Sequence, residues 1–469
     1  MRPELKDNQY DLSCLLAREI GWERVIVDEN IKLNYGKDNS IAGYHPFDVL
    51  VKPANAFDIA SVLRICSAHD VPVTPRGGGS GVTGGALPVR GGVVLSLEGL
   101  SRIIEIEEVE GYVVAEAGVI TADLCKAVEE KHLMYPVAPS SASFSFIGGN
   151  VAENAGSVRS CKYGMTSEYV MNLEVVSPDG RIFWTGSNRR KNSTGIDLTH
   201  LFVGSEGILG VISKVVLRLL PLPAIKTVLL AGYATLEDAC KAIVAIRQSR
   251  LQPSAAELIC ENALRITAEY LGAAEPLVKD GISTHVLLEL EAGDTHQMDE
   301  MIGLASTILA EDAVGRILQD KGPMEGSGLG KVRFSIGNAM TTRGRFYRDI
   351  DACVPLLRLN EYIRYMENVC KNSHISLVCF GHAMDGNVHA MLLFDSLHDL
   401  DRANQIDCIA EKIYAKAVAI GGVISGEHGI GCLQKEFVKL QFDQVRIGLM
   451  QQVKALFDPS GILNPGKVF

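Results

Sequence analysis

The chain has 469 residues, of which 47% are hydrophobic and 22% are charged, and its 45 basic and 56 acidic side chains leave a net charge of −11. This length predicts two or three domains around a large core, and the acidic balance without a basic block argues against nucleic acid as a partner. No apolar run reaches the length of a membrane span, and the N-terminus has no signal-peptide core. We therefore expect a cytoplasmic protein, at most peripheral to the inner face of the membrane.

The 11 cysteines are odd in number and include no Cys-x-x-Cys pair. Zinc and iron–sulfur sites usually need such close spacing, so the pattern favours scattered reduced thiols.

From residue 50 to residue 222 the chain alternates short strands with helices, which predicts an α+β or α/β unit. Strands are expected at 93–97, 112–119 and 173–177, and helices at 56–70 and 121–132.

Beyond the proline-marked stretch 217–223, helical and strand-like stretches again alternate, which predicts a second domain. Here helices are expected at 236–249, 261–271, 297–312, 356–372 and 400–420, a strand at 284–292, a surface loop at 325–331 and a β-hairpin at 376–394. The Gly-rich stretch 423–436 and the tail 457–469 contain many turn-forming residues, so no helix is expected in the tail.

One Gly-rich stretch, VPVTPRGGGSGVTGG (71–85), contains the spacing Gly79-x-Gly81-x-x-Gly84. A Rossmann dinucleotide site needs a strand before these glycines and a helix directly after them. The strand is present, but Pro88 and the pair Gly91-Gly92 leave no room for the helix. The pattern favours a loop that holds a phosphate with backbone amides, and a plain structural turn is the alternative.

Two histidines flank a strong turn signal, Asp385-Gly386. A two-residue loop there pairs His382 directly with His389, at a Cβ separation of roughly 4.5–5.5 Å from which two imidazoles can share a metal ion. A stacked or singly bonded histidine pair is an equal alternative.

Glu427-His428 lies in SGEHGIG, flanked by glycine. Its carboxylate can complete a set of two histidines and one carboxylate, leaving His428 to act as a base. The alternative is a salt-bridged surface turn. The other histidines (45, 69, 132, 200, 285, 296, 374 and 398) stand alone and favour structural roles.

Arginines recur at 333, 343, 345 and 348, and a guanidinium is a common clamp for a substrate carboxylate. A solvated basic face is the alternative for each of them.

Six stretches carry a resemblance over nearly the whole chain: PRGGGSGVTGG, PSSASFSFIGGNVAENAGSVRSCKYG, RKNSTGIDLTHLFVGSEGILGVI, GHAMDGNVH, GEHGIG and LNPGKV. In this order they resemble the FAD-linked D-2-hydroxyacid dehydrogenases of the vanillyl-alcohol-oxidase, or p-cresol-methylhydroxylase (PCMH), superfamily. That family includes D-lactate dehydrogenases, the flavin subunit of glycolate oxidase and D-2-hydroxyglutarate dehydrogenase.

The resemblance implies an α+β fold in which a PCMH-type FAD-binding domain is joined to an α+β cap domain that binds substrate. The expected divisions are an N-terminal segment (1–45), the FAD-binding domain (46–222), the cap domain with the metal-binding hairpin (223–415), and a C-terminal segment that returns to the flavin (416–469).

The resemblance also implies which residues hold FAD. The loop offers no histidine or cysteine for a tether, so the flavin is expected to be noncovalent. The implied contacts are Pro75, Arg76, Gly77, Gly78, Gly79, Ser80, Gly81, Pro139, Ser140, Ser141, Gly148, Gly149, Asn150, Asn154, Ala155, Gly156, Gly164, Glu206, Gly207, Gly210, Val211, Ile212 and Asn464.

By the same resemblance, His382, His389 and Glu427 look like ligands of one divalent metal (Zn, Mn or Fe(II)), and His428 looks like the base. The metal would coordinate the carboxylate and the α-hydroxyl of the substrate. The base would take the hydroxyl proton, and Cα would deliver hydride to flavin N5. Arg333, Arg345 and Arg348 are the candidates for the substrate carboxylate.

The chain departs from its relatives at two positions. Ser157 stands where relatives usually carry a glycine, and this change is expected to affect the packing near the flavin. Met391 stands where relatives that bind a second carboxylate tend to carry a polar residue, which favours D-lactate or a near analogue.

Alternatives left open are a glycolate or D-2-hydroxyglutarate dehydrogenase, a non-redox flavoenzyme of the same fold, and a flavin-free metal-dependent hydrolase. The expected electron acceptor is an electron-transfer flavoprotein, an iron–sulfur subunit or a quinone rather than oxygen. The assembly stays open, a homodimer included.

Overall fold

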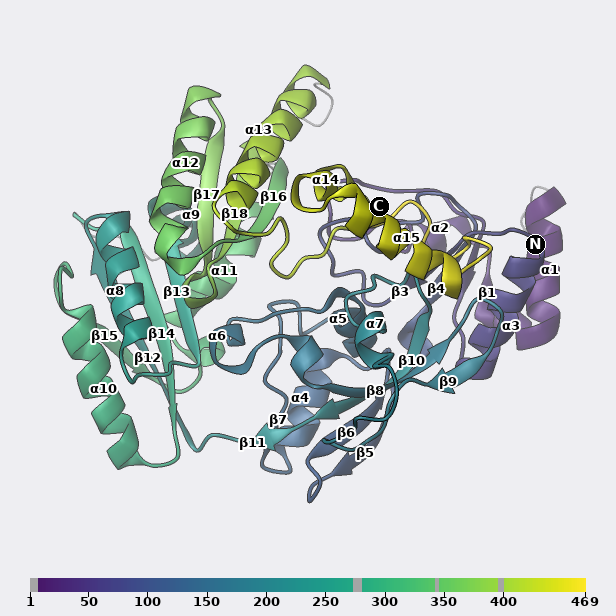
Figure 1. Ribbon diagram of the computed structural model, residues 1–469, viewed down its shortest axis with the longest axis horizontal. Helices are drawn as coiled ribbons and strands as arrows, with labels where there is room; N and C mark the ends of the chain where they lie inside the picture. The colour runs from purple at the N-terminus through teal and green to yellow at the C-terminus, as the bar shows by residue number, and fades with distance from the viewer. Residues whose placement is uncertain (1–6, 273–280, 342–345, 395–399) are drawn as a thin grey trace. The chain divides into compact units, whose positions relative to one another are not determined.

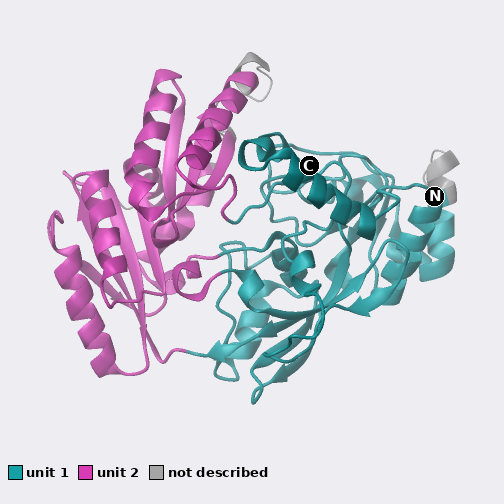
Figure 2. Ribbon diagram, viewed as in Figure 1, with its two compact units in different colours: residues 1–156, 165–222, 427–469 teal, residues 157–164, 223–426 magenta. Residues whose placement is uncertain are grey.

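The computed structural model describes residues 7–272, 281–341, 346–394 and 400–469 and divides into two compact units (Figure 2). Unit 1 contains Met1–Gly156, Met165–Leu222 and Glu427–Phe469, and unit 2 contains Ser157–Gly164 and Pro223–Gly426. The short stretch 157–164 thus belongs to unit 2, although it lies within the expected FAD-binding domain. None of the helices in these described ranges combines the length and apolar character that crossing a bilayer requires.

Unit 1 is built on two main sheets and a short two-stranded ladder (Figure 1). The four-stranded sheet has the order β1 (Val25–Ile26), β2 (Val49–Val51), β4 (Val93–Ser96), β3 (Val73–Arg76). The five-stranded antiparallel sheet has the order β5 (Ile103–Glu107), β6 (Tyr112–Glu116), β10 (Val211–Arg218), β8 (Val170–Val176), β9 (Ile182–Trp184), and β11 (Leu220–Pro221) pairs with β7 (Leu133–Met134). In the four-stranded sheet, Leu50 of β2 and Val94 of β4 form a buried apolar cluster with Phe47.

The helices of unit 1 include several whose starts follow from local capping. Asn55 accepts hydrogen bonds from the amides of Phe57 and Asp58 and so begins α3, and Asp443 begins α15 in the same way. The set comprises α1 (Asp7–Ile20), α2 (Glu29–Lys32), α3 (Ala56–Ala68), α4 (Thr121–Glu129), α5 (Ile147–Glu153), α7 (Thr199–Phe202), α14 (Val438–Gln441) and α15 (Gln444–Phe457).

The C-terminal tail of unit 1 runs beside β3. The amide of Val73 donates to the carbonyl of Ile462 at 2.8 Å, and the amide of Asn464 donates back to the carbonyl of Val73 at 2.8 Å. The tail therefore lies against the strand that leads into the Gly-rich loop.

Unit 2 is one seven-stranded antiparallel sheet (Figure 1). Its order is β15 (Leu318–Lys321), β12 (Ile225–Tyr233), β14 (Thr284–Ala292), β13 (Ala255–Cys260), β17 (Ser376–His382), β18 (Asn387–Phe394), β16 (Phe346–Cys353). One face packs an apolar cluster that includes Ile259, Phe380 and Met391 against helices α9 and α11. The α-helices of the unit are α6 (Ser160–Tyr163), α8 (Leu236–Gln248), α9 (Glu261–Leu271), α10 (Thr295–Leu309), α11 (Gly330–Thr341), α12 (Leu359–Asn372) and α13 (Leu400–Ala419).

The α+β class is confirmed, as are the expected long helices and the strand at 284–292. The surface loop expected at 325–331 is confirmed in part: residues 327–329 form a bend and turns and Gly328 is exposed, but Ser327 is buried and α11 begins at Gly330. Helix α11 was missed although Val332, Ile336 and Met340 are spaced as one buried helix face. Strand β16 and helix α15 were also missed, the latter because none of its residues is buried.

Candidate functional site

The Gly-rich loop of unit 1 leaves β3 without entering a helix. Residues 77–92 form turns and loop up to β4, which runs parallel to β3. The prediction that no Rossmann site lies here is therefore confirmed, since no helix follows the glycines before β4.

The glycines of this loop lie in contrasting surroundings. A Cβ on Gly78 would fall 2.2 Å from the carbonyl oxygen of Phe144, so the loop packs against the 144–149 stretch too closely for a side chain. A Cβ on Gly81 would meet no described atom within 4 Å. One side of the loop is thus closed by backbone, and the other is open beside Gly81.

Arg76, the last residue of β3, places a buried cation at this loop. It is 7% exposed, and its Nη2 donates to the carbonyl oxygen of Asn34 at 3.3 Å. Its Nη1 is buried without a hydrogen-bond partner among the described residues. Burial lowers the pKa of Arg76, but a guanidinium stays charged in proteins. An unsatisfied buried cation beside amide-rich glycines suits an anionic group such as the FAD pyrophosphate.

Several residues expected to hold FAD use their side chains within unit 1. Asn150 donates to the hydroxyl of Thr121 at 2.8 Å, and Asn464 donates to the carbonyls of Gly85 (3.0 Å) and Glu206 (2.7 Å). The others are placed as follows: Pro139, Ser140 and Ser141 before α5, Gly148 and Gly149 in α5, Asn154 at its left-handed C-terminal cap, Ala155 and Gly156 after it, Gly207 and Gly210 before β10, Val211 and Ile212 in β10, and Gly164 at the end of α6 in unit 2.

The loop that carries Glu427 and His428 is held by a buried carboxylate. Glu206 accepts hydrogen bonds from the amides of Ile430 (2.8 Å) and Gly431 (2.6 Å). The hydroxyl of Thr83, within the Gly-rich loop, donates to the carbonyl oxygen of His428 at 3.1 Å. The expected base is therefore attached by its backbone to the same loop that is expected to hold FAD.

A second carboxylate, Glu153, lies beside this loop and was missed from the sequence. A Cβ on Gly429 would fall 2.2 Å from its Oε2, and that oxygen is buried without a hydrogen-bond partner in the described part of the chain. Burial, reinforced by the charge of Glu206, raises the pKa of Glu153 well above its usual range. Lys467 is also buried here, and burial lowers its pKa to about 8.

In unit 2, the register of the His-bearing hairpin differs from the expected one. The turn spans Ala383–Asp385 and Gly386, so His389 lies opposite Phe380 on β17 and not opposite His382. The prediction of a two-residue loop is wrong because the turn adopts a 3-10 conformation that ends at the left-handed Gly386 (φ 72°). The shift is even, so both histidines remain on one face of the sheet.

Each histidine instead lies directly opposite a carboxylate on its other neighbouring strand. Glu257 on β13 pairs with His382, and Asp351 on β16 pairs with His389. Cross-strand partners share a face, so the four side chains form a row on one side of the sheet. All four are buried.

Glu257 fixes the orientation of His382. Its Oε1 lies 2.5 Å from His382 Nδ1, and its other oxygen accepts from the guanidinium of Arg333. Burial alone would raise the pKa of Glu257, but the charges of His382 and Arg333 outweigh it and hold the pKa below its usual value. A carboxylate on one ring nitrogen directs the other nitrogen to a metal in many metal sites.

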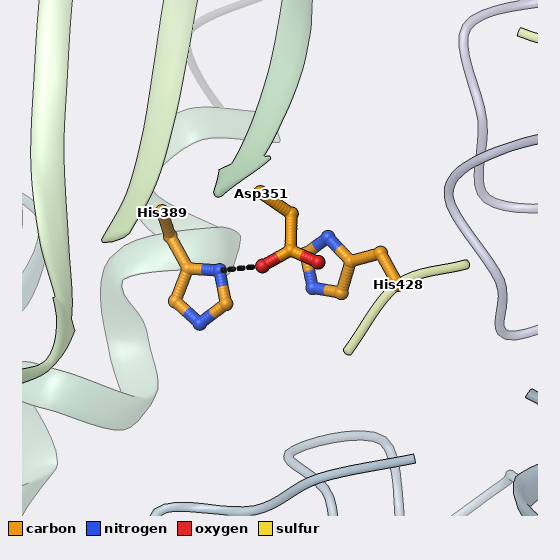
Figure 3. Close-up of side chains that lie close together, drawn as sticks. All are labelled: Asp351, His389 and His428. Carbon is orange, nitrogen blue, oxygen red and sulfur yellow. Dashed lines mark ion pairs between the residues drawn. The ribbon is translucent and has the colours of Figure 1, made fainter. Parts of the chain in front are cut away.

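The free sides of the two imidazoles meet. His382 Nε2 lies 3.3 Å from His389 Nε2, and the rings are at 88° to each other. Two nitrogens at this distance match two ligands of one ion at a near-tetrahedral angle, given metal–nitrogen bonds of about 2.0–2.1 Å. On its other side, His389 Nδ1 lies 3.6 Å from Asp351 Oδ1, the ion pair drawn in Figure 3. The residues therefore fit a metal ion, although a histidine–histidine hydrogen bond has the same separation.

Glu427, the third expected ligand, directly follows Gly426, the last residue of unit 2. The amide of Gly426 donates to Asp351 Oδ2 at 2.9 Å. The peptide bond between them keeps Glu427 within one residue of a backbone group that Asp351 binds. His428 Nε2 lies 3.9 Å from Glu427 Oε1.

The three arginines proposed for substrate have different surroundings. Arg333 forms the buried ion pair with Glu257 and stacks over Phe380, with 4.6 Å to the ring centroid. Arg348 is buried in β16, and its Nη2 lies 4.0 Å from Asp407. Arg345 lies outside the described residues. Their role toward substrate stays a prediction.

Glu257 and Asp351 were not singled out from the sequence. Glu257 did carry a signal, because it is an acid within the strongly apolar strand AAELIC (255–260), where a buried charge needs a partner. Asp351 carried none, since its strand FYRDIDAC (346–353) holds other charged residues.

Two family models match the chain. The model described as "FAD binding domain" matches residues 47–186, and the one described as "FAD linked oxidases, C-terminal domain" matches residues 222–468.

Curated relatives match over most of their own length. The chain is 34% identical to the glycolate oxidase subunit GlcD of Bacillus subtilis over 422 residues (90% of this chain, 89% of the relative). It is 36% identical to the D-lactate dehydrogenase of Archaeoglobus fulgidus over 423 residues (90% and 91%). Among solved structures, p-cresol methylhydroxylase matches with a TM-score of 0.79 at 17% identity, covering 99% of this chain and 97% of that one. This last likeness confirms the PCMH-type fold.

Proposed function

Because this chain belongs to the FAD-linked oxidases and is an FAD-dependent oxidoreductase, we propose that it oxidises a D-2-hydroxyacid to the 2-oxoacid. D-lactate is the preferred substrate in this proposal, and the electrons leave to an acceptor other than oxygen.

The observation that carries the proposal is the pair of buried imidazoles whose Nε2 atoms lie 3.3 Å apart. With Glu427 they form the two-histidine, one-carboxylate set that suits Zn, Mn or Fe(II). Such a set leaves coordination positions open for the carboxylate and hydroxyl oxygens of a 2-hydroxyacid. Glu257 supports it by holding His382 through Nδ1 at 2.5 Å.

In unit 1, Arg76 and the amides of the 77–81 loop would hold FAD by its pyrophosphate. Among the described residues, Arg76 Nη1 has no hydrogen-bond partner and no atom lies within 4 Å of a Cβ on Gly81, which supports this assignment. When bound, FAD supplies the acceptor for the hydride that leaves substrate Cα, and the metal supplies polarisation of the hydroxyl. No histidine or cysteine lies in the loop, so the flavin is noncovalent, and acid precipitation should release all the yellow colour.

His428 is the proposed base that takes the hydroxyl proton. Its carbonyl oxygen accepts a hydrogen bond from the Thr83 hydroxyl, and the amides of Ile430 and Gly431 donate to Glu206. The backbone is thereby anchored at His428 and two to three residues after it, which favours a defined orientation of the imidazole. Loss of the hydroxyl proton to His428 and of hydride from Cα converts the alcohol to the ketone.

The apolar surroundings of Met391 support a small or apolar substrate. Met391 lies two residues after His389 on β18 and belongs to the apolar cluster with Phe380. A second substrate carboxylate would find no hydrogen-bond donor in the Met391 side chain, so D-2-hydroxyglutarate is disfavoured.

Anaerobic mixing with D-lactate, L-lactate, glycolate and D-2-hydroxyglutarate tests this proposal by the bleaching of the flavin absorbance. D-lactate should bleach the flavin fastest. Faster reduction by D-2-hydroxyglutarate or glycolate would reassign the substrate, and no reduction by any 2-hydroxyacid would overturn the proposal. Reoxidation with an electron-transfer flavoprotein, a quinone and oxygen then separates the possible acceptors.

A further inference from the structure

Asp351 is a buried carboxylate to which the proposed reaction assigns no role. Its side chain is fully buried in β16 and lies directly opposite His389 in the sheet. A carboxylate in such a place is costly unless both oxygens have partners. The partners of Asp351 are divided between two parts of unit 2.

Oδ1 faces strand β18. It accepts a hydrogen bond from Asn387 Nδ2 at 2.7 Å and lies 3.6 Å from His389 Nδ1 (Figure 3). The Asn387 bond fixes this oxygen on the side of the imidazole that faces away from His382.

Oδ2 faces the segment that leads to Glu427. It accepts from the amide of Gly426 at 2.9 Å and from the hydroxyl of Ser425 at 3.2 Å. The backbone of the same segment pairs with β16, since Val423 and Cys353 exchange hydrogen bonds of 2.8 and 3.2 Å.

Gly426 has no room for a side chain at this point. A Cβ there would fall 2.2 Å from Asn387 Nδ2 and 3.0 Å from Asp351 Oδ1. The segment is therefore packed against the carboxylate and its amide partner rather than resting loosely beside them.

We propose that Asp351 is a positioning residue for the metal: one oxygen orients the His389 imidazole, and the other sets the backbone that delivers Glu427. The inference rests on the proposed function, because it presupposes that His389 and Glu427 are ligands. Glu257 differs, since its second oxygen binds Arg333 and so it orients only one ring. Asp351 couples a ligand on a strand to a ligand on a loop.

The test is the affinity for Zn²⁺, measured by chelator competition on the FAD-loaded protein, in Asp351→Asn. The amide keeps the size of the side chain but replaces one acceptor oxygen with a donor, so one of the two sets of contacts is lost. Loss of a group that orients a ligand typically lowers metal affinity by about 10- to 100-fold. FAD content should equal that of the parent.

Glu291→Gln is the matched control. Glu291 is also a buried carboxylate in this sheet and is paired with Lys162 and Lys226. Both variants are expected to lower the melting temperature, but only Asp351→Asn should weaken Zn²⁺ binding. Equal Zn²⁺ affinity in parent and Asp351→Asn would overturn the inference. A parent that binds no Zn²⁺, Mn²⁺ or Fe²⁺ would instead overturn the metal assignment of the proposed function.

Ser425→Ala keeps the test open if Asp351→Asn does not fold. It removes one donor to Oδ2 from a half-buried position. Zn²⁺ affinity should fall by about 2- to 10-fold, the usual worth of one hydrogen bond. Unchanged affinity in a folded Ser425→Ala protein would count against the coupling.

Discussion

The Gly-rich loop of unit 1 and the row of buried side chains in unit 2 (Glu257, His382, His389 and Asp351) are built in opposite ways. The loop presents backbone, closed on one side by Phe144 and open at Gly81, with a buried cation from Arg76. The row presents side chains, and each imidazole has a carboxylate opposite it on a neighbouring strand. A substitution in the loop should therefore act by placing a side chain where the cofactor binds. A substitution in the row should act by removing a side chain that binds or supports the metal.

The difference also concerns where the supporting groups come from. The loop is a continuous stretch of chain, so its character is local. Glu257 and His382 are 125 residues apart, and only the sheet brings them together. A backbone site can be recognised from a few residues, whereas a side-chain site depends on the register of several strands.

The largest effect is expected for His389→Ala. Loss of one of the three proposed ligands should remove the metal and abolish flavin reduction by the hydroxyacid, while FAD stays bound because the loop in unit 1 is untouched. Metal analysis and the visible spectrum of the purified variant check both parts. His285→Ala, at another buried histidine of the same sheet, should keep the metal. A normal metal content in His389→Ala would contradict the assignment of the row.

His428→Asn should slow flavin reduction by about 10²- to 10⁴-fold, the typical contribution of a general base. Metal and FAD content should stay normal, since the residue is neither a proposed ligand nor part of the 77–81 loop. Stopped-flow reduction under anaerobic conditions measures the rate. A rate within about threefold of the parent, well inside that range, would mean that another group takes the proton.

Gly81→Ala should weaken FAD binding without unfolding the protein. The added methyl meets no described atom within 4 Å, so any loss of FAD affinity reports a clash with the cofactor itself. A steric conflict of this kind costs about 1–3 kcal/mol, or roughly 5- to 150-fold in affinity. Titration of the deflavinated protein with FAD gives the value. Gly448→Ala in α15, where a Cβ also meets no described atom, should bind FAD like the parent.

Glu153→Gln should give the smallest effect, a rise in melting temperature that grows with pH. The folded-state pKa of Glu153 is raised, so the acid form is favoured by folding and stability is lost as pH rises above the unfolded pKa of about 4.3. The amide removes that loss, so the gain should be larger at pH 8 than at pH 5. Differential scanning calorimetry at the two pH values measures it. An equal shift at both would show that the carboxyl ionises normally in the fold.

The sequence predicted most of the long helices because their apolar spacing agrees with their tertiary burial, as in α8 and α12. It failed for α15, which buries none of its residues and so carries no clear apolar face. It also failed for the hairpin register, because Asp385-Gly386 signals a turn but does not decide whether the loop has two residues or four.

Local chemistry was enough to single out the Gly-rich loop, the two histidines of the hairpin and Glu427-His428 as candidates, because each motif is short and its residue types restrict what the backbone or the side chains can do. The carboxylates behind the histidines were decided only by tertiary structure. The strand of Glu257 signals that this acid needs a partner but not which one, and Asp351 carries no such signal; they become partners of His382 and His389 through the order and register of a seven-stranded sheet. That order is set by the burial of the whole sheet face, a property that no single stretch of the chain contains.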